Sequence, residues 1–141
     1  MDQYIAFINE NLMLVIALGV ISAMLFFNLF GARLRGFKTV HPTEAVSMIN
    51  HDDALVLDVR ENNEYQSGHI ISSTHIPLSA LSGRLGELDK YKGRPVIVGC
   101  RSGQRSAQAC AKLRKQGFES VYNLSGGVMA WQSANLPLTR K

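Results

Sequence analysis

An uncharged stretch, Leu12 to Phe30, limits most strongly what this chain can fold into. As an α-helix its 19 residues would extend roughly 28 Å, close to the hydrocarbon thickness of a bilayer. Ser22 and Asn28 are its only strongly polar side chains, so it lacks the polar face of a helix on a soluble domain. A signal peptide would need a basic start and a small-residue cleavage site, and the sequence has neither. We therefore predict a membrane-spanning helix at residues 12–30.

The charges on either side predict how this helix crosses the membrane. Two acidic residues and no Lys or Arg precede it, whereas Arg33, Arg35 and Lys38 follow it closely. Because basic residues are retained on the cytoplasmic side, we expect the N-terminus outside and the C-terminal part in the cytoplasm. The predicted division is a short extracytoplasmic tail (1–11), the transmembrane helix (12–30), a juxtamembrane linker (31–36) and a globular domain (37–141).

The charge balance and the helix sequence bear on partners. Beyond Phe30 the chain carries 15 basic and 9 acidic residues, a surplus of +6. This surplus contains no basic run interleaved with aromatic residues, so we expect an anionic substrate or an anionic lipid surface and no nucleic-acid partner. Gly19 and Ala23 form a small-xxx-small pair, which leaves a membrane-protein partner of the helix open.

Short apolar runs alternate with helical patterns through the rest of the chain. The run from Ala54 to Val59 is almost continuously apolar, which is typical of a parallel strand covered on both faces. The alternation predicts an α/β sandwich with a mostly parallel, five-stranded sheet. The predicted strands are residues 37–40, 54–59, 73–76, 95–99 and 121–124, and the predicted helices begin near Pro42, Glu61, Pro77, Gln104 and Gly126.

The stretch Gly99 to Ser106, with the sequence GCRSGQRS, joins a predicted strand to a predicted helix. In a parallel sheet, ligands bind beyond the carboxyl ends of the strands, where Cys100 falls. The strand ending at Val59 brings Asp58 and Arg60 to the same edge. Amides of such a turn point inward as an anion nest, and the helix N-terminus and nearby arginines add positive charge. We therefore predict that Cys100 ionises readily and acts as a nucleophile.

Other roles for the cysteines fit less well. Cys110 falls in the middle of the predicted helix, where we expect a small buried side chain. Two cysteines make no disulfide framework, and neither has metal-ligand spacing, so we expect no metal or cofactor. The four histidines match no cysteine-protease signature. What remains for Cys100 is attack on an anionic sulfur or phosphorus centre.

Four motifs, in this order and spacing, resemble the rhodanese domain over residues 37–138: Asp58-Val59-Arg60; Glu64-Tyr65 with Gly68-His69-Ile70; Cys100 to Ser106; and Gly126-Gly127 with Ala130-Trp131. With one N-terminal membrane helix, the chain resembles the membrane-anchored, single-domain rhodanese-like proteins of the bacterial inner membrane. The resemblance implies a three-layer sandwich and sulfurtransferase activity. A Cys100 persulfide would take sulfane sulfur from a small anionic donor such as thiosulfate and pass it to a thiol or another nucleophilic acceptor. The alternative is a membrane adaptor that mainly binds a membrane-protein partner.

The length of the cysteine loop separates two chemistries of this fold. Four residues lie between Cys100 and Arg105, whereas the related phosphatases and arsenate reductases have five residues between Cys and Arg. A shorter loop makes a tighter cradle, which favours one terminal sulfur atom over a tetrahedral phosphate.

The resemblance also implies roles for individual residues. Cys100 carries the persulfide, and the loop amides stabilise its charge, with Gly103 supplying backbone freedom. Arg101 and Arg105 attract the donor, and Arg105 closes the loop. The remaining expectations are that Ser102 and Gln104 shape the loop mouth, Asp58 and Arg60 form supporting ion pairs, His69 is packed within its motif, and Trp131 belongs to the core.

Overall fold

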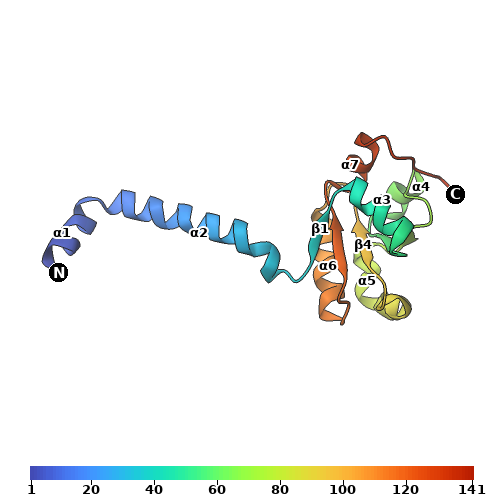
Figure 1. Ribbon diagram of the computed structural model, residues 1–141, viewed down its shortest axis with the longest axis horizontal. Coiled ribbons are helices and arrows are strands. Elements are labelled where there is room, and N and C mark those ends of the chain that lie inside the picture. The colour runs from blue at the N-terminus through green and yellow to red at the C-terminus, as the bar shows by residue number, and fades with distance from the viewer. The chain divides into compact units, whose positions relative to one another are not determined.

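The computed structural model describes residues 1–141 except for the side chain of Ala32, and it consists of two compact units, Met1–Arg35 and Gly36–Lys141. The first unit holds helices α1 (Asp2–Glu10) and α2 (Leu12–Leu34), drawn in blue in Figure 1. Helix α2 contains a candidate membrane span, Leu12–Gly31, with a mean hydropathy of 2.5. The sequence pattern did not predict α1.

The second unit is built on a sheet of five strands in the order β1-β5-β4-β2-β3. All four strand pairs are parallel, which confirms the predicted α/β fold. The strands are β1 (Lys38–Val40), β2 (Leu55–Asp58), β3 (Thr74–His75), β4 (Val96–Gly99) and β5 (Val121–Leu124). Asp58 lies beside Gly99 in the register of β2 and β4. The residues that follow these two strands therefore emerge side by side at the carboxyl edge of the sheet.

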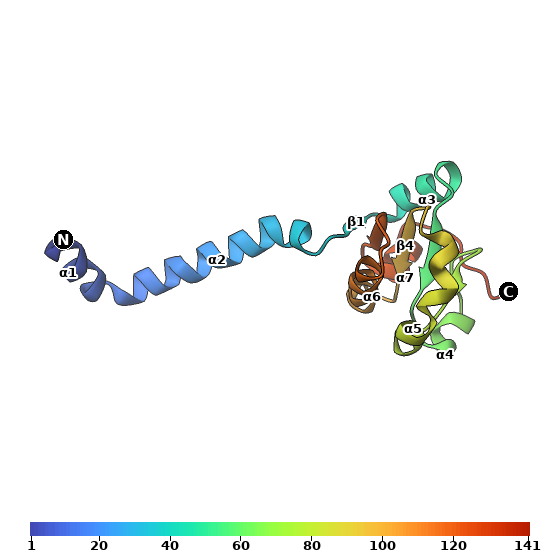
Figure 2. The same ribbon diagram turned by 90° about the horizontal axis from the view of Figure 1, so that it is seen from below.

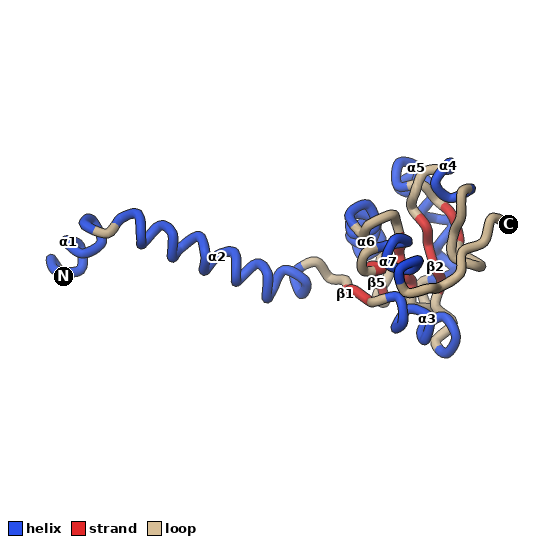
Figure 3. The backbone as a smooth tube through the Cα atoms, turned by 90° about the horizontal axis from the view of Figure 1, so that it is seen from above, coloured by secondary structure: helices blue, strands red, loops and turns tan.

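Helices cover both faces of the sheet and make three layers (Figure 3). Alternate strand residues face opposite ways: Val96 and Val98 belong to one buried cluster and Ile97 to the other. The first cluster packs against α5 and α6, which lie beside each other (Figure 1, Figure 2), and the second packs against α3 and α7. The helices are α3 (Pro42–His51), α4 (Asn62–Gln66), α5 (Leu78–Arg84), α6 (Gln104–Lys115) and α7 (Gly127–Ser133).

One predicted helix differs from expectation. The α-helix predicted to begin near Pro77 ends at Arg84, and the chain continues as a 3₁₀-helix, η1 (Leu85–Tyr91). Leu85, Leu88 and Tyr91 all pack on the first buried cluster. Their spacing of three residues matches the three residues per turn of a 3₁₀-helix, which places all three side chains on one side.

Candidate active site

The cysteine loop places the thiol of Cys100 inside a turn of backbone. Cys100 directly follows β4, and Gly103, with φ of +110°, ends the loop where α6 begins. The amide of Gly103 donates to Cys100 Sγ at 3.0 Å, and the hydroxyl of Ser106 lies 3.3 Å from the same sulfur. The cysteine is 1% exposed and Ser106 is fully buried. The loop is thus folded around the sulfur, as the motif predicts.

Hydrogen bonds make this thiol more acidic despite its burial. Burial is the largest single influence on the Cys100 pKa and raises it, but hydrogen bonds from the Ser106 hydroxyl and the amides of Ser106, Gly103 and Ser102 together lower it below its usual value. We expected the neighbouring arginines to favour the thiolate. The leading favourable contributions come instead from the main chain and Ser106.

The carbonyl groups of the loop are held by α7. The amides of Val128 and Met129 donate to the carbonyl oxygens of Cys100 (2.8 Å) and Arg101 (3.2 Å). Gly127 makes this approach feasible, because a Cβ atom there would lie 2.3 Å from the Cys100 oxygen. Gly127 also has φ of +60°, a conformation that costs other residues about 1–2 kcal/mol. The Gly126-Gly127 motif therefore allows α7 to pack closely against the main chain of the cysteine loop.

Asp58 and Arg60 meet in a buried ion pair beside the loop. Arg60 Nη2 lies 2.8 Å from Asp58 Oδ2, and the two residues are 5% and 2% exposed. The same Nη2 donates to the carbonyl of Gly68 at 2.8 Å. The pair thus joins the end of β2 to the segment that follows α4.

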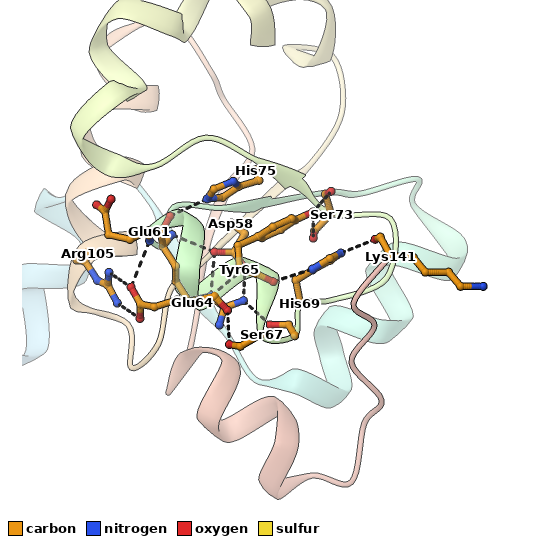
Figure 4. Close-up of polar contacts among 12 residues, drawn as sticks. Asp58, Glu61, Glu64, Tyr65, Ser67, His69, Ser73, His75, Arg105 and Lys141 are labelled. Atoms are coloured by element: carbon orange, nitrogen blue, oxygen red, sulfur yellow. Dashed lines mark hydrogen bonds and ion pairs between the residues drawn. The ribbon is translucent and has the colours of Figure 1, made fainter.

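Arg105 is held by a carboxylate that the sequence analysis gave no role. Its guanidinium binds Glu64 of α4 through two hydrogen bonds of 2.6 and 2.9 Å (Figure 4). Arg105 holds the pKa of Glu64 down at about 2, aided by the Glu61 amide and opposed by partial burial. The charge of Arg105 is therefore paired with that of Glu64. Arg101, in contrast, is exposed and directs its charge to solvent.

Two polar residues beneath the loop have contacts that the sequence did not predict, although Ser106 belongs to the loop motif. The Ser106 hydroxyl donates to Asn123 Oδ1 at 2.5 Å, and Asn123 Nδ2 donates to the Gly103 carbonyl at 3.1 Å. Asn123 lies in β5, where its polar side chain interrupts an apolar strand. That interruption was the available signal. Which residue it would meet depends on the pairing of β5 with β4.

An open cleft adjoins the loop between α4 and α7. Arg101 contributes the cationic side chain from the loop, and Met129 contributes an exposed apolar one from α7. Ser102 and Gln104 are exposed on the loop. The cleft is lined by Arg60, Glu64, Ser67, Arg101, Val128, Met129 and Gln132. This arrangement can admit an anionic or mixed polar and apolar molecule beside the cysteine loop.

His69 and Trp131 make structural contacts with the C-terminal segment. The imidazole of His69 stacks on Tyr65, with ring centroids 3.8 Å apart. Its two nitrogens lie 2.9 Å from the carbonyl oxygens of Tyr65 and Lys141 (Figure 4). Trp131 is buried in the second cluster, and its indole N–H donates to the Pro137 carbonyl at 3.1 Å. Both residues tie the C-terminal segment to the domain.

Comparison with known protein families assigns the chain. The rhodanese-like domain matches residues 41–134. The chain belongs to the rhodanese-like domain family. It is 33% identical over 141 residues to the uncharacterized protein YibN of Escherichia coli, covering 99% of both chains. This full-length match and the single N-terminal apolar helix confirm the resemblance to single-domain rhodanese-like proteins.

Relatives with sulfurtransferase names support a sulfurtransferase-type function. A sulfurtransferase of Allochromatium vinosum is 40% identical over 87 residues, covering 62% of this chain and 79% of that protein. Among solved structures, a rhodanese-related protein from Thermoplasma volcanium aligns with a TM-score of 0.68 and 28% identity, covering 74% of this chain and all of that one.

Substitution of Gly127 tests whether its close contact with the cysteine loop stabilises the domain. We expect Gly127→Ala to lower the free energy of unfolding by more than about 2 kcal/mol, because the methyl group adds overlap with the Cys100 carbonyl to the cost of a left-handed backbone. Urea unfolding followed by fluorescence of Trp131, the single tryptophan, measures this. Gly83→Ala, whose Cβ meets nothing within 4 Å, is the control. Equal stabilities of the two variants would contradict the assignment.

The pair of Glu64 and Arg105 predicts a pH-dependent stability. The pKa of Glu64 falls from a usual 4.5 to about 2 on folding, so its stabilisation is complete above about pH 4.5 and is lost as the pH falls toward 2. The difference in free energy of unfolding between the wild type and Glu64→Gln should therefore be largest near neutral pH and shrink below about pH 4.5. Urea unfolding from pH 7 to about pH 3 tests this. Glu87→Gln, which removes a solvent-exposed ion pair with Arg84, should show a smaller difference throughout. A constant difference for Glu64→Gln would refute the prediction.

Proposed function

We propose that this protein is a membrane-anchored sulfurtransferase that carries sulfane sulfur as a persulfide on Cys100. The observation that carries the proposal is the enclosure of Cys100 Sγ by the Gly103 amide and the Ser106 hydroxyl, at 3.0 and 3.3 Å. Such donors stabilise a sulfur anion in a site that excludes water. The sulfurtransferase names of relatives support the same chemistry.

The reaction follows in two displacements. The Cys100 thiolate attacks the outer sulfur of a donor such as thiosulfate, the donor S–S bond breaks, and sulfite leaves with its electron pair. A thiol or other nucleophilic acceptor then attacks the outer sulfur of the persulfide. The bond between Cys100 Sγ and the outer sulfur then breaks, and Cys100 leaves as thiolate. The same donors that lower the Cys100 pKa thus assist both attack and departure.

The loop side chains divide the remaining work. Arg101 is exposed beside the cleft and attracts an anionic donor. Arg105 is bound to Glu64 and fixes the end of the loop. Because Glu64 partly neutralises its charge, Arg105 attracts an anionic donor less strongly than Arg101 does. Ser102 and Gln104 contact the incoming acceptor at the mouth, while Asp58 and Arg60 keep the neighbouring strand end in place.

Helix α2 anchors the protein in this proposal. Its span Leu12–Gly31 is long and apolar enough to cross a bilayer. The basic residues that follow it favour a cytoplasmic location for the rhodanese-like domain, in the inner membrane of a bacterium. A reducing cytoplasm also suits a free, acidic cysteine.

Mass spectrometry tests the persulfide. After incubation of the purified protein with thiosulfate, the peptide containing Cys100 should gain about 32 Da, the mass of one sulfur atom. Cys100→Ser should remove the gain, whereas Cys110→Ala should keep it, because Cys110 is buried and its pKa is raised to about 12 by burial and by Cys100. Failure of every sulfane-sulfur donor to modify Cys100 would favour the adaptor role instead.

Protease accessibility tests the orientation. In inverted membrane vesicles, whose cytoplasmic face points outward, added protease should digest residues 37–141 because positive-inside bias places them on that face. A lumenal marker protein that resists digestion serves as the control for sealed vesicles. Protection of this domain until detergent is added would contradict the orientation.

A further inference from the structure

The hydroxyl of Ser106 has two acceptors and only one proton. Its Oγ lies 2.5 Å from Asn123 Oδ1 and 3.3 Å from Cys100 Sγ. Ser106 is fully buried, so bulk water does not supply an alternative partner. The hydroxyl can donate its hydrogen bond either to the amide oxygen or to the sulfur, but not to both at once.

The amide of Asn123 is fixed in orientation. Its Nδ2 donates to the Gly103 carbonyl at 3.1 Å, so its Oδ1 must face Ser106 and can only accept. While Ser106 donates to Asn123, it presents lone pairs to Cys100. That arrangement suits a protonated thiol, which can donate to Ser106 Oγ, and it opposes a thiolate, which needs a donor.

We propose that the Ser106 hydroxyl alternates between donating its hydrogen bond to Asn123 Oδ1 and donating it to Cys100 Sγ. Asn123 is then a positioning residue that sets how strongly Ser106 stabilises the sulfur anion. In the thiol state the bonds run from Cys100 to Ser106 and from Ser106 to Asn123. When the thiol loses its proton, the hydroxyl turns and donates to Sγ. Asn123 therefore competes with the thiolate for one hydrogen bond.

The same switch follows the charge during sulfur transfer, a consequence that rests on the proposed persulfide chemistry. In the persulfide the negative charge lies on the outer sulfur, Sγ is neutral, and Ser106 donates to Asn123. When an acceptor attacks the outer sulfur, its electron pair forms the new bond and the electrons of the S–S bond pass to Sγ. Ser106 turns again and donates to the departing thiolate. Asn123 Oδ1 thus accepts the hydrogen bond of the Ser106 hydroxyl in the states in which Sγ carries no charge.

The other charged groups near the sulfur are held in ion pairs, are buried or face the solvent. Arg105 of α6 is paired with Glu64, whose pKa is about 2. Cys110 of α6 has a pKa near 12 and stays a neutral thiol. Arg101 of the loop is exposed to solvent. Asp58 of β2, beside Gly99 in the sheet, is bound to Arg60, and α7 meets the loop through main-chain amides. A titration of Cys100 reactivity therefore reports mainly on the sulfur and its hydrogen bonds.

Alkylation of Cys100 in the full-length protein in detergent micelles tests the proposal. The rate of reaction with iodoacetamide, followed on the Cys100 peptide by mass spectrometry as a function of pH, reports the thiolate fraction. In Asn123→Leu, which has similar volume and no acceptor, Ser106 is free to donate to sulfur. We expect the Cys100 pKa to fall and alkylation at about pH 6 to quicken by roughly threefold or more. In Asn123→Asp, a stronger acceptor, the pKa should rise.

The sign of the Asn123→Leu effect separates the switch from simple damage. Loss of the Asn123 bond to Gly103 could loosen the loop, but a looser loop withdraws amide donors and raises the Cys100 pKa. In a Ser106→Ala background, Asn123→Leu should no longer lower the pKa, since the shared hydroxyl is gone. An unchanged or raised pKa in Asn123→Leu, or an equal fall in the Ser106→Ala background, would overturn the proposal. This readout needs no sulfur donor, so a failed persulfide assay leaves the result for the switch intact.

Discussion

The site depends on the opposite directions of N–H and C=O in each peptide unit. A loop that points its amides at Cys100 Sγ must point its carbonyls outward, and these need donors of their own. Helix α7 supplies two through Val128 and Met129, and Asn123 supplies a third to Gly103. The anion cradle is thus only as rigid as the donors behind it. This explains why a glycine at 127, far along the chain, supports the loop around Cys100.

Ion pairs and stacked rings extend this support to the rest of the domain. Arg60 joins β2 to Gly68, and Glu64 joins α4 to the start of α6. His69 continues the chain of contacts to the C-terminal residue Lys141. Each of these contacts links segments separated in sequence, so α4, too short to be stable by itself, is fixed by what it binds. The paired charges of Arg60 and Arg105 near the loop thus serve mainly to hold it in place.

Features carried by local patterns could be predicted from the sequence, and features carried by facing side chains could not. The strand ending at Asp58 and the helix after Cys100 are evident from apolar runs and the loop motif, and the parallel sheet follows from their alternation. The partner of Arg105 could not be predicted, because the sequence contains several acidic residues that could pair with either loop arginine. Only the position of α4 in the fold brings Glu64 to Arg105. Ser106 was read as the end of a motif, although it is the residue that touches the sulfur through its hydroxyl.

Stabilisation of the thiolate by main chain and by buried Ser106 has a consequence for specificity. The side chains of Arg101, Ser102 and Gln104 are exposed and turned away from that task. They can therefore differ in charge and size without loss of the nucleophile, provided that the loop backbone keeps its path over Gly127. In the proposed sulfur transfer, recognition of the donor and the acceptor is in this way separable from activation of the sulfur. Activation depends on tightly packed positions such as Gly127, where one added methyl group would displace the loop. Recognition depends on side chains that are exposed to solvent.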